Sequence, residues 1–193
     1  MKTDYLDLVQ LHSCGPNVLE QGEAVDTLTR AKAAGKTRFV GYSGDNEEAL
    51  WAVNSGLFDT LQTSFSVADQ RARSKLFAGA KANGMGIIIK RPIANGVWGA
   101  ESNPSQYGQE YFRRAQLMAK PGPLPGSPED RIMLALGFVL SHPVDTAIVG
   151  TRNLEHLRSN IQLLASDINL PQNAVYELVR RFEVMDDGWV HLE

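Results

Sequence analysis

Short apolar runs alternate with longer amphipathic stretches along most of the chain. The short runs predict strands, and the amphipathic stretches predict helices, several of which have a capping residue before them or a glycine after them. Ser127 and Asn46 are two of the predicted N-caps. The predicted strands are 5–12, 37–43, 58–65, 85–90 and 146–150, the predicted helices are 23–34, 47–54, 71–83, 128–141, 153–165 and 171–185, and the polar residues 94–126 predict a long loop.

The order of these elements is strand followed by helix, repeated five times. Ile87, Ile88 and Ile89 form a continuous apolar run of the kind found in strands buried on both faces. Alternation of such strands with helices indicates parallel βα units, which form either a doubly wound sheet or a barrel. Because no G-x-G-x-x-G turn follows the first strand, the barrel is favoured. Eight units close a barrel, so we expect an α/β fold that is a partial TIM (β/α)8 barrel of about five βα units plus a C-terminal helix.

Composition restricts the functional classes. The chain has 193 residues, of which 43% are hydrophobic and 21% charged, and its net charge of -3 comes without any basic block. A nucleic-acid partner is therefore not expected. Cys14 is the single cysteine, which excludes an internal disulfide. No signal-like segment or apolar run of about 18 residues is found, so we expect no membrane partner and a cytoplasmic location.

Five stretches of the chain resemble the aldo/keto reductase family in order and spacing. They are 5–12 (YLDLVQLH), 35–43 (GKTRFVGYS), 61–62 (LQ), 86–96 (GIIIKRPIANG) and 147–160 (AIVGTRNLEHLRSN). The resemblance implies barrel strands four to eight, and a catalytic set of Tyr, Asp, Lys and a substrate-orienting His. His12 matches that His, whereas the other three positions would precede Met1. We therefore expect residues 1–193 to be a single, N-terminally truncated aldo/keto reductase domain.

The resemblance assigns roles to residues at the ends of the first three strands. His12 would hydrogen-bond a substrate carbonyl at the mouth of the barrel, although without the family match a structural His is the simpler interpretation. Ser43 and Gln62 would bind the carboxamide of a nicotinamide ring, which needs both a donor and an acceptor. They could instead be a turn residue and an edge-strand residue. The family usually has Asn where Gly44 stands here, which removes one contact.

The remaining candidate cofactor contacts lie at or after the ends of the last two predicted strands. Lys90 stands where many members stack an aromatic ring, and Arg91 could reach a pyrophosphate; as an alternative, both are solvated. The stretch from Gly150 to Asn160 combines a glycine turn with a helix N-terminus, a natural anion site. In the family it binds the 2′-phosphate and adenine of NADP, although a Glu is common where Ser159 stands here. The residues of this stretch that match are Gly150, Thr151, Arg152, His156 and Asn160, with the last three expected on one helix face.

The function implied is NADP(H)-dependent reduction of a small-molecule aldehyde or ketone, with NAD(H) less favoured as cofactor and no metal site. We expect the chain alone to be inactive, since only His12 of the catalytic set is present. One alternative is a non-catalytic NADP(H)-binding module or sensor subunit. A barrel lyase or isomerase is less favoured, because Lys90 has no carboxylate pair beside it. The open sheet edges favour self-association.

Overall fold

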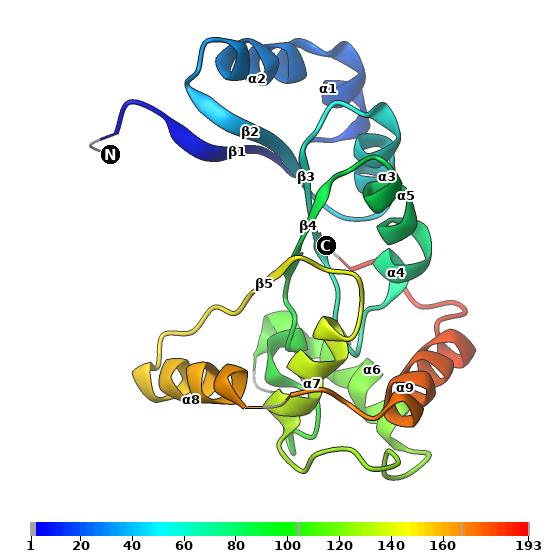
Figure 1. Ribbon diagram of the computed structural model, residues 1–193. Helices are drawn as coiled ribbons and strands as arrows, with labels where there is room; N and C mark the ends of the chain where they lie inside the picture. Colours follow the sequence, from blue (N-terminus) through cyan, green and yellow to red (C-terminus); the bar gives the residue numbers. More distant parts are fainter. Residues whose placement is uncertain (1–2, 104, 167, 193) are drawn as a thin grey trace. The chain divides into compact units, whose positions relative to one another are not determined.

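The computed structural model describes residues 3–103, 105–166 and 168–192 (Figure 1). Five strands alternate with helices: β1 Leu6–His12, β2 Thr37–Ser43, β3 Thr60–Ser64, β4 Gly86–Lys90 and β5 Thr146–Ile148. The strands are hydrogen-bonded in chain order, β1-β2-β3-β4-β5, and no further pairing closes the sheet within the described part of the chain. β1 pairs in parallel with β2, and β2 in parallel with β3. The predicted α/β architecture with an open sheet is therefore confirmed.

The chain divides into two compact units, which are described separately. Unit 1 comprises the described parts of Met1–Ser64, Ala72–Ile88 and His191–Glu193; unit 2 comprises Phe65–Arg71 and Ile89–Val190. Four helices lie wholly in unit 1: α1 Pro16–Gln21, α2 Glu23–Ala33, α3 Asn46–Ser55 and α5 Phe77–Ala82. The short helix α4 Arg71–Lys75 begins at the boundary.

Unit 1 buries one face of its helices against its strands. Ala49 and Ala52 of α3, Leu61 of β3 and Phe77 of α5 are all buried, and α2 lies beside β2 (Figure 1). The helix predicted at 71–83 is divided in two at Leu76, a turn residue between α4 and α5. Helix α1 is not among the predicted helices; Pro16 occupies its first position, to which proline is well suited.

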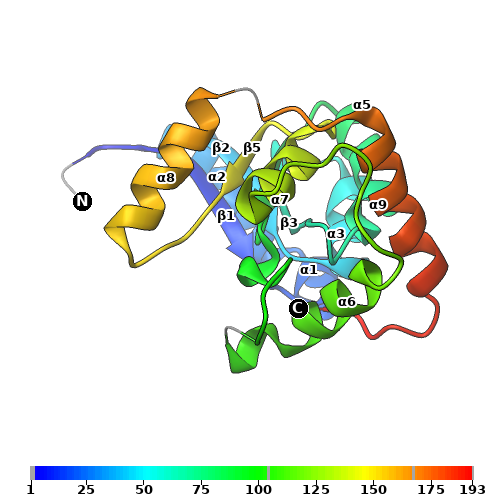
Figure 2. The same cartoon turned by 90° about the horizontal axis from the view of Figure 1, so that it is seen from below.

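Unit 2 contains the helices α6 Gln109–Ala119, α7 Arg131–Leu140, α8 Leu154–Ala165 and α9 Gln172–Met185, and the short 3-10 helices η1 Ala94–Gly96 and η2 Gln106–Gly108. Its core includes Phe65 stacked on Phe138 of α7. Gly137 permits close packing, since a Cβ there would lie 2.4 Å from the carbonyl oxygen of Ile168. Figures 1 and 2 both show an extended segment between β5 and α8, and no residue of α8 is buried.

Three predictions about helix ends and loops were wrong. The stretch 94–126 is not one loop, because α6 forms inside it and buries Tyr111, Arg114 and Met118. Helix α7 begins at Arg131 rather than 128, since the Asp130 side chain accepts bonds from two backbone amides and is the cap. At the start of α3 the N-cap is Asp45, not Asn46.

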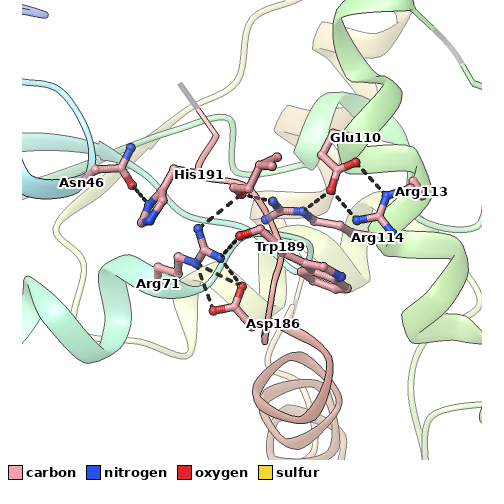
Figure 3. A network of polar contacts seen from close by, with 9 residues as sticks. Asn46, Arg71, Glu110, Arg113, Arg114, Asp186, Trp189 and His191 are labelled. Carbon is pink, nitrogen blue, oxygen red and sulfur yellow. Dashed lines mark hydrogen bonds and ion pairs between the residues drawn. The ribbon is translucent and has the colours of Figure 1, made fainter.

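The C-terminal segment of unit 2 is held by arginine side chains (Figure 3). Arg71 binds the carboxylate of Asp186 through Nε at 2.9–3.0 Å and donates to the carbonyl oxygen of Trp189 at 2.7 Å. Arg114, which is completely buried, donates to the carbonyl oxygen of Val190 and to Glu110. Its guanidinium also lies 4.8 Å from the centre of the Trp189 ring. These contacts fix the chain after α9.

Candidate functional site

His12, Ser43 and Gln62 lie side by side across the three strands of unit 1. His12 is the register partner of Ser43 in the β1–β2 pair, and Ser43 is the partner of Gln62 in the β2–β3 pair. Two backbone bonds extend this pairing past the strand ends, from Ser13 N to Ser43 O and from Gly44 N to Gln62 O. Because partners in register present their side chains to the same face, the three candidates form one row, which we call the three-strand row.

The side chains of this row differ in exposure. Ser43 is 2% exposed, and its Oγ has no hydrogen-bond partner among the described residues. Gln62 is half-buried, and His12 at the end of β1 is exposed. A buried hydroxyl without a partner is costly in a folded protein unless a ligand or water satisfies it. The row therefore combines a buried hydroxyl, an amide and an accessible imidazole.

Gly44, where the family usually has Asn, is required by the packing of Tyr42. A Cβ at position 44 would lie 2.6 Å from Tyr42 Cε1 and 2.7 Å from its hydroxyl oxygen. The ring is not free to move aside, because it is buried and its hydroxyl donates to the carbonyl oxygen of Cys14 at 2.8 Å. Burial, with smaller contributions from nearby acidic groups led by Glu48, raises the pKa of Tyr42. Tyr42 thus explains why the Asn is absent.

A second polar row lies one layer below the first on the same face. Gly41 pairs with Gln10 on β1 and with Thr60 on β3, each two residues before a member of the three-strand row. A Cβ on Gly41 would lie 2.1 Å from Thr60 Oγ1 and 3.2 Å from Gln10 Nε2. Both of these polar atoms are buried without a hydrogen-bond partner among the described residues. The glycine is therefore needed for Thr60 to pack across β2.

Asp45 is a residue of this region that the sequence analysis missed. Its carboxylate accepts bonds from Thr63 Oγ1, Ser64 N and Ser64 Oγ. An Asp before a helix is typical of a capping residue, whereas the contact of Asp45 with β3 depends on the tertiary fold. No pattern in the sequence marks it.

In unit 2, Lys90 and Arg91 lie where β4 ends and a tight turn begins. Both are half-buried, and the Arg91 guanidinium lies 5.4 Å from the centre of the Tyr107 ring. Arg91, Ala94 and Asn95 all have positive φ angles, between 47° and 59°. Such strained backbone is concentrated at functional sites in proteins.

The stretch from Gly150 to Asn160, which we call the α8 segment, is held by local bonds. Asn153 caps α8 as predicted, accepting from Glu155 N at 2.9 Å, and Thr151 Oγ1 accepts from Asn153 N at 3.1 Å. Arg152 precedes the cap, so it is not on the helix face that His156 and Asn160 were expected to share with it. Arg152 is exposed and forms no ion pair with the residues that the structure describes.

The cavity, metal and membrane features of the structure involve none of the candidate residues named above. A cavity of about 470 Å³ in unit 2 is lined by Trp98, Leu124, Arg131 and neighbouring residues. Within the described ranges, no group of three or more His, Cys, Asp and Glu side chains is arranged to hold a metal. No described helix is both long and apolar enough to cross a membrane.

Comparison with known proteins places this geometry in a family. An uncharacterized oxidoreductase of Bacillus subtilis, YrpG, is 28% identical over 181 residues, which cover 84% of this chain and 54% of that protein. The chain thus spans about half the length of this curated relative.

Among solved structures, the apo form of the aldo-keto reductase AKR11C1 from Bacillus halodurans superposes with a TM-score of 0.76 at 20% identity, over 93% of this chain and 63% of that one. An aldo/keto reductase from Klebsiella pneumoniae, solved with NADP and acetate, superposes with a TM-score of 0.64 at 24% identity, over 93% of this chain and 59% of that one. These likenesses confirm that the open sheet is part of a (β/α)8 barrel. Residues 1–180 match the profile of the aldo/keto reductase family. The chain therefore belongs to the aldo/keto reductase family.

Proposed function

We propose that this chain binds NADP(H), in preference to NAD(H), as part of a carbonyl reductase that acts on small aldehydes or ketones. The observation that carries the proposal is the three-strand row, in which register places the partnerless Ser43 hydroxyl between Gln62 and His12. We further propose a cytoplasmic protein with no nucleic-acid partner.

The row suits the nicotinamide end of the cofactor. A carboxamide donates through its nitrogen and accepts through its oxygen, and the Ser43 hydroxyl and Gln62 amide offer both functions. When bound, the cofactor supplies the hydride. His12 is exposed at the end of β1, so its imidazole can donate to the oxygen of a substrate carbonyl and orient it. The fit lacks the contact of the family's Asn, which Tyr42 excludes from position 44.

The α8 segment suits the phosphate end. Helix N-termini favour anions, and α8 is a 12-residue helix. Arg152 is an exposed guanidinium with no acidic partner in the described part of the chain, and guanidinium groups bind phosphate in a fork. A Cβ on Gly150 would meet nothing within 4 Å, which leaves room above the turn. We propose His156 and Asn160 as contacts to the adenosine, and Lys90 and Arg91 as contacts to the cofactor near β4.

We also propose that these 193 residues bind the cofactor without turnover at enzymatic rates. Of the catalytic set that the resemblance implies, only the His is matched, at His12. Without a tyrosine proton donor tuned by Asp and Lys, the developing alkoxide would have no acid to protonate it. A non-catalytic NADP(H)-binding module is therefore the second candidate, and it shares the binding sites of the first.

Thermal unfolding with NADPH, and with NADH as control, tests binding. A ligand present at about one hundred times its dissociation constant should stabilise the folded state by roughly 2.7 kcal/mol. A larger shift with NADPH than with NADH is expected, and no shift with either would contradict the proposal. Carbonyl-dependent oxidation of NADPH at enzymatic rates would contradict the proposed lack of turnover while supporting the reductase function.

A further inference from the structure

The register of β2 with β3 ends at the two residues proposed to hold the nicotinamide, and one backbone bond, from Gly44 N to Gln62 O, follows it. The register partners are Gly41 with Thr60, Tyr42 with Leu61, and Ser43 with Gln62. Thr63 and Ser64 continue β3 beyond the last of these pairs. The last pair of a ladder is the one most able to fray, so the separation of Ser43 and Gln62 depends on what holds β3 just after it.

Asp45 provides that connection through its side chain. Its Oδ1 accepts from Ser64 N at 2.7 Å and from Thr63 Oγ1 at 3.0 Å, and its Oδ2 accepts from Ser64 Oγ at 3.2 Å. Thr63 and Ser64 are buried, which shelters these bonds from water. A carboxylate is an acceptor with two oxygens, so it can receive all three donors at once.

The backbone of Asp45 is also held in place. Asp45 is the N-cap residue of α3 and has an extended backbone, and its carbonyl oxygen accepts from Ala49 N at 3.1 Å. Its side chain makes no capping bond to α3, although an Asp at this position usually does. The carboxylate instead joins the start of α3 to the end of β3.

The turn between Ser43 and Asp45 completes the arrangement. Gly44 N donates to Gln62 O at 3.0 Å. Since Gly44 packs against the anchored Tyr42 ring, this turn has little freedom to adjust. Any movement of Thr63 and Ser64 is then transmitted to Gln62, the adjoining residue of β3.

We propose that Asp45 is a positioning residue, which holds Gln62 opposite Ser43 so that both reach the nicotinamide carboxamide of the cofactor. This inference rests on the proposed function of the three-strand row. Asp45 itself touches neither the cofactor nor the substrate in this arrangement; it acts through Thr63, Ser64 and the backbone of β3.

The test compares Asp45→Ala with Asp45→Asn in the full chain. Asn keeps an oxygen for Ser64 N and Thr63 Oγ1, whereas Ala removes every acceptor. Glu47→Ala is the matched control, because Glu47 is an acidic residue two positions after Asp45, in the first turn of α3, and its partner is Lys75 rather than β3. Two ligands are titrated: NADPH, and adenosine 2′,5′-bisphosphate, which has no nicotinamide. Hydrogen exchange at the Ser64 amide reports the bond directly.

We expect Asp45→Ala to weaken NADPH binding by about tenfold, to leave bisphosphate binding unchanged, and to expose the Ser64 amide to exchange. Asp45→Asn and Glu47→Ala should behave as the wild type. If Asp45→Ala does not fold, Thr63→Val serves instead: it removes one donor to Asp45 with little change of shape, and should weaken NADPH binding by a few-fold.

Three outcomes would overturn the inference. Normal NADPH affinity in Asp45→Ala would remove the positioning role while leaving the proposed function intact. Equal weakening of NADPH and the bisphosphate would show a general loss of structure. Failure of the wild type itself to bind NADPH would overturn the proposed function, and this inference with it.

Discussion

The three-strand row and the α8 segment are proposed to bind opposite ends of one cofactor, yet they are built differently. In the row, the neighbours of each side chain are set by backbone pairing, and Ser43 is deeply buried. In the α8 segment, order comes from short-range bonds among Thr151, Asn153 and Glu155. None of the residues of α8 is buried.

Because of this difference, we expect substitutions in the two regions to affect folding stability to different degrees. A substitution in the row disturbs the packing of three strands, so its effect on binding is combined with an effect on folding. A substitution in the α8 segment changes an exposed group, and surface changes of this kind alter the free energy of unfolding by less than about 0.5 kcal/mol. We expect the segment to tolerate changes that the row does not.

The largest expected effect is that of Gly41→Ala. The new Cβ would meet Thr60 Oγ1 at 2.1 Å in a packed layer, and overpacking of this kind lowers the free energy of unfolding by about 1–3 kcal/mol. Urea unfolding measures the change. Gly150→Ala is the matched control, since its Cβ meets nothing within 4 Å. Equal stability of the two variants would show that the layer below the three-strand row is no more tightly packed than the α8 segment.

The second prediction compares substitutions at the two residues proposed to bind opposite ends of the cofactor. Arg152→Ala should weaken both NADPH and adenosine 2′,5′-bisphosphate by about tenfold or more, since it removes a charged partner of a phosphate. Ser43→Ala should weaken NADPH only. Isothermal titration of each variant with both ligands gives the comparison. Should Ser43→Ala weaken the bisphosphate as well, the row would not be specific for the nicotinamide.

A smaller effect is expected from Asn153→Ala. The variant loses the bond to Glu155 N, and loss of an N-cap costs about 1 kcal/mol. Because α8 has no buried residue, the cost should appear as local opening of the helix rather than as a change in cooperative unfolding. Hydrogen exchange of the α8 amides measures it. A matching decrease in the stability of the whole chain would mean that α8 is coupled to the core.

The smallest effect is a change with pH. Burial raises the pKa of Tyr42, so its phenol ionises first in the unfolded chain. The contribution of Tyr42 to stability is then complete below about pH 10 and decreases above it, by roughly 0.8 kcal/mol at pH 10.5. Tyr42→Phe should lose less stability between pH 9 and 10.5 than the wild type, by guanidinium unfolding. Parallel pH profiles of the two proteins would contradict this.

The sequence predicted correctly those elements that depend on neighbouring residues, such as an apolar run or a helix cap. The short apolar run at Thr37–Ser43 and the Asn153 cap predicted the observed bounds of β2 and the start of α8. Alternation of strands and helices also predicted the parallel order that brings His12, Ser43 and Gln62 into register. Local patterns did not predict helix α6. The buried residues of α6 do have helical spacing, but they include the charged Arg114 and lie in the polar stretch 94–126, which predicted a loop.

Other features depend on contacts that no short window contains. Asp45 and Asp130 both precede helices, yet Asp130 caps α7 while Asp45 binds β3. The sequence pattern is the same, and the tertiary neighbours decide the outcome. In the same way, Gly44 follows from the packing of Tyr42 rather than from a turn of its own.

Trp189 gives the protein a built-in optical reporter. Its indole lies between the guanidinium of Arg114 at 4.8 Å, that of Arg113 at 5.7 Å, and the Phe182 ring at 5.6 Å. Indole emission responds to nearby charge and to water, so release of the segment after α9 should change both its intensity and its wavelength. With Trp51 and Trp98 replaced by Phe, the remaining emission would follow the C-terminal segment of unit 2 alone, in real time and without a label.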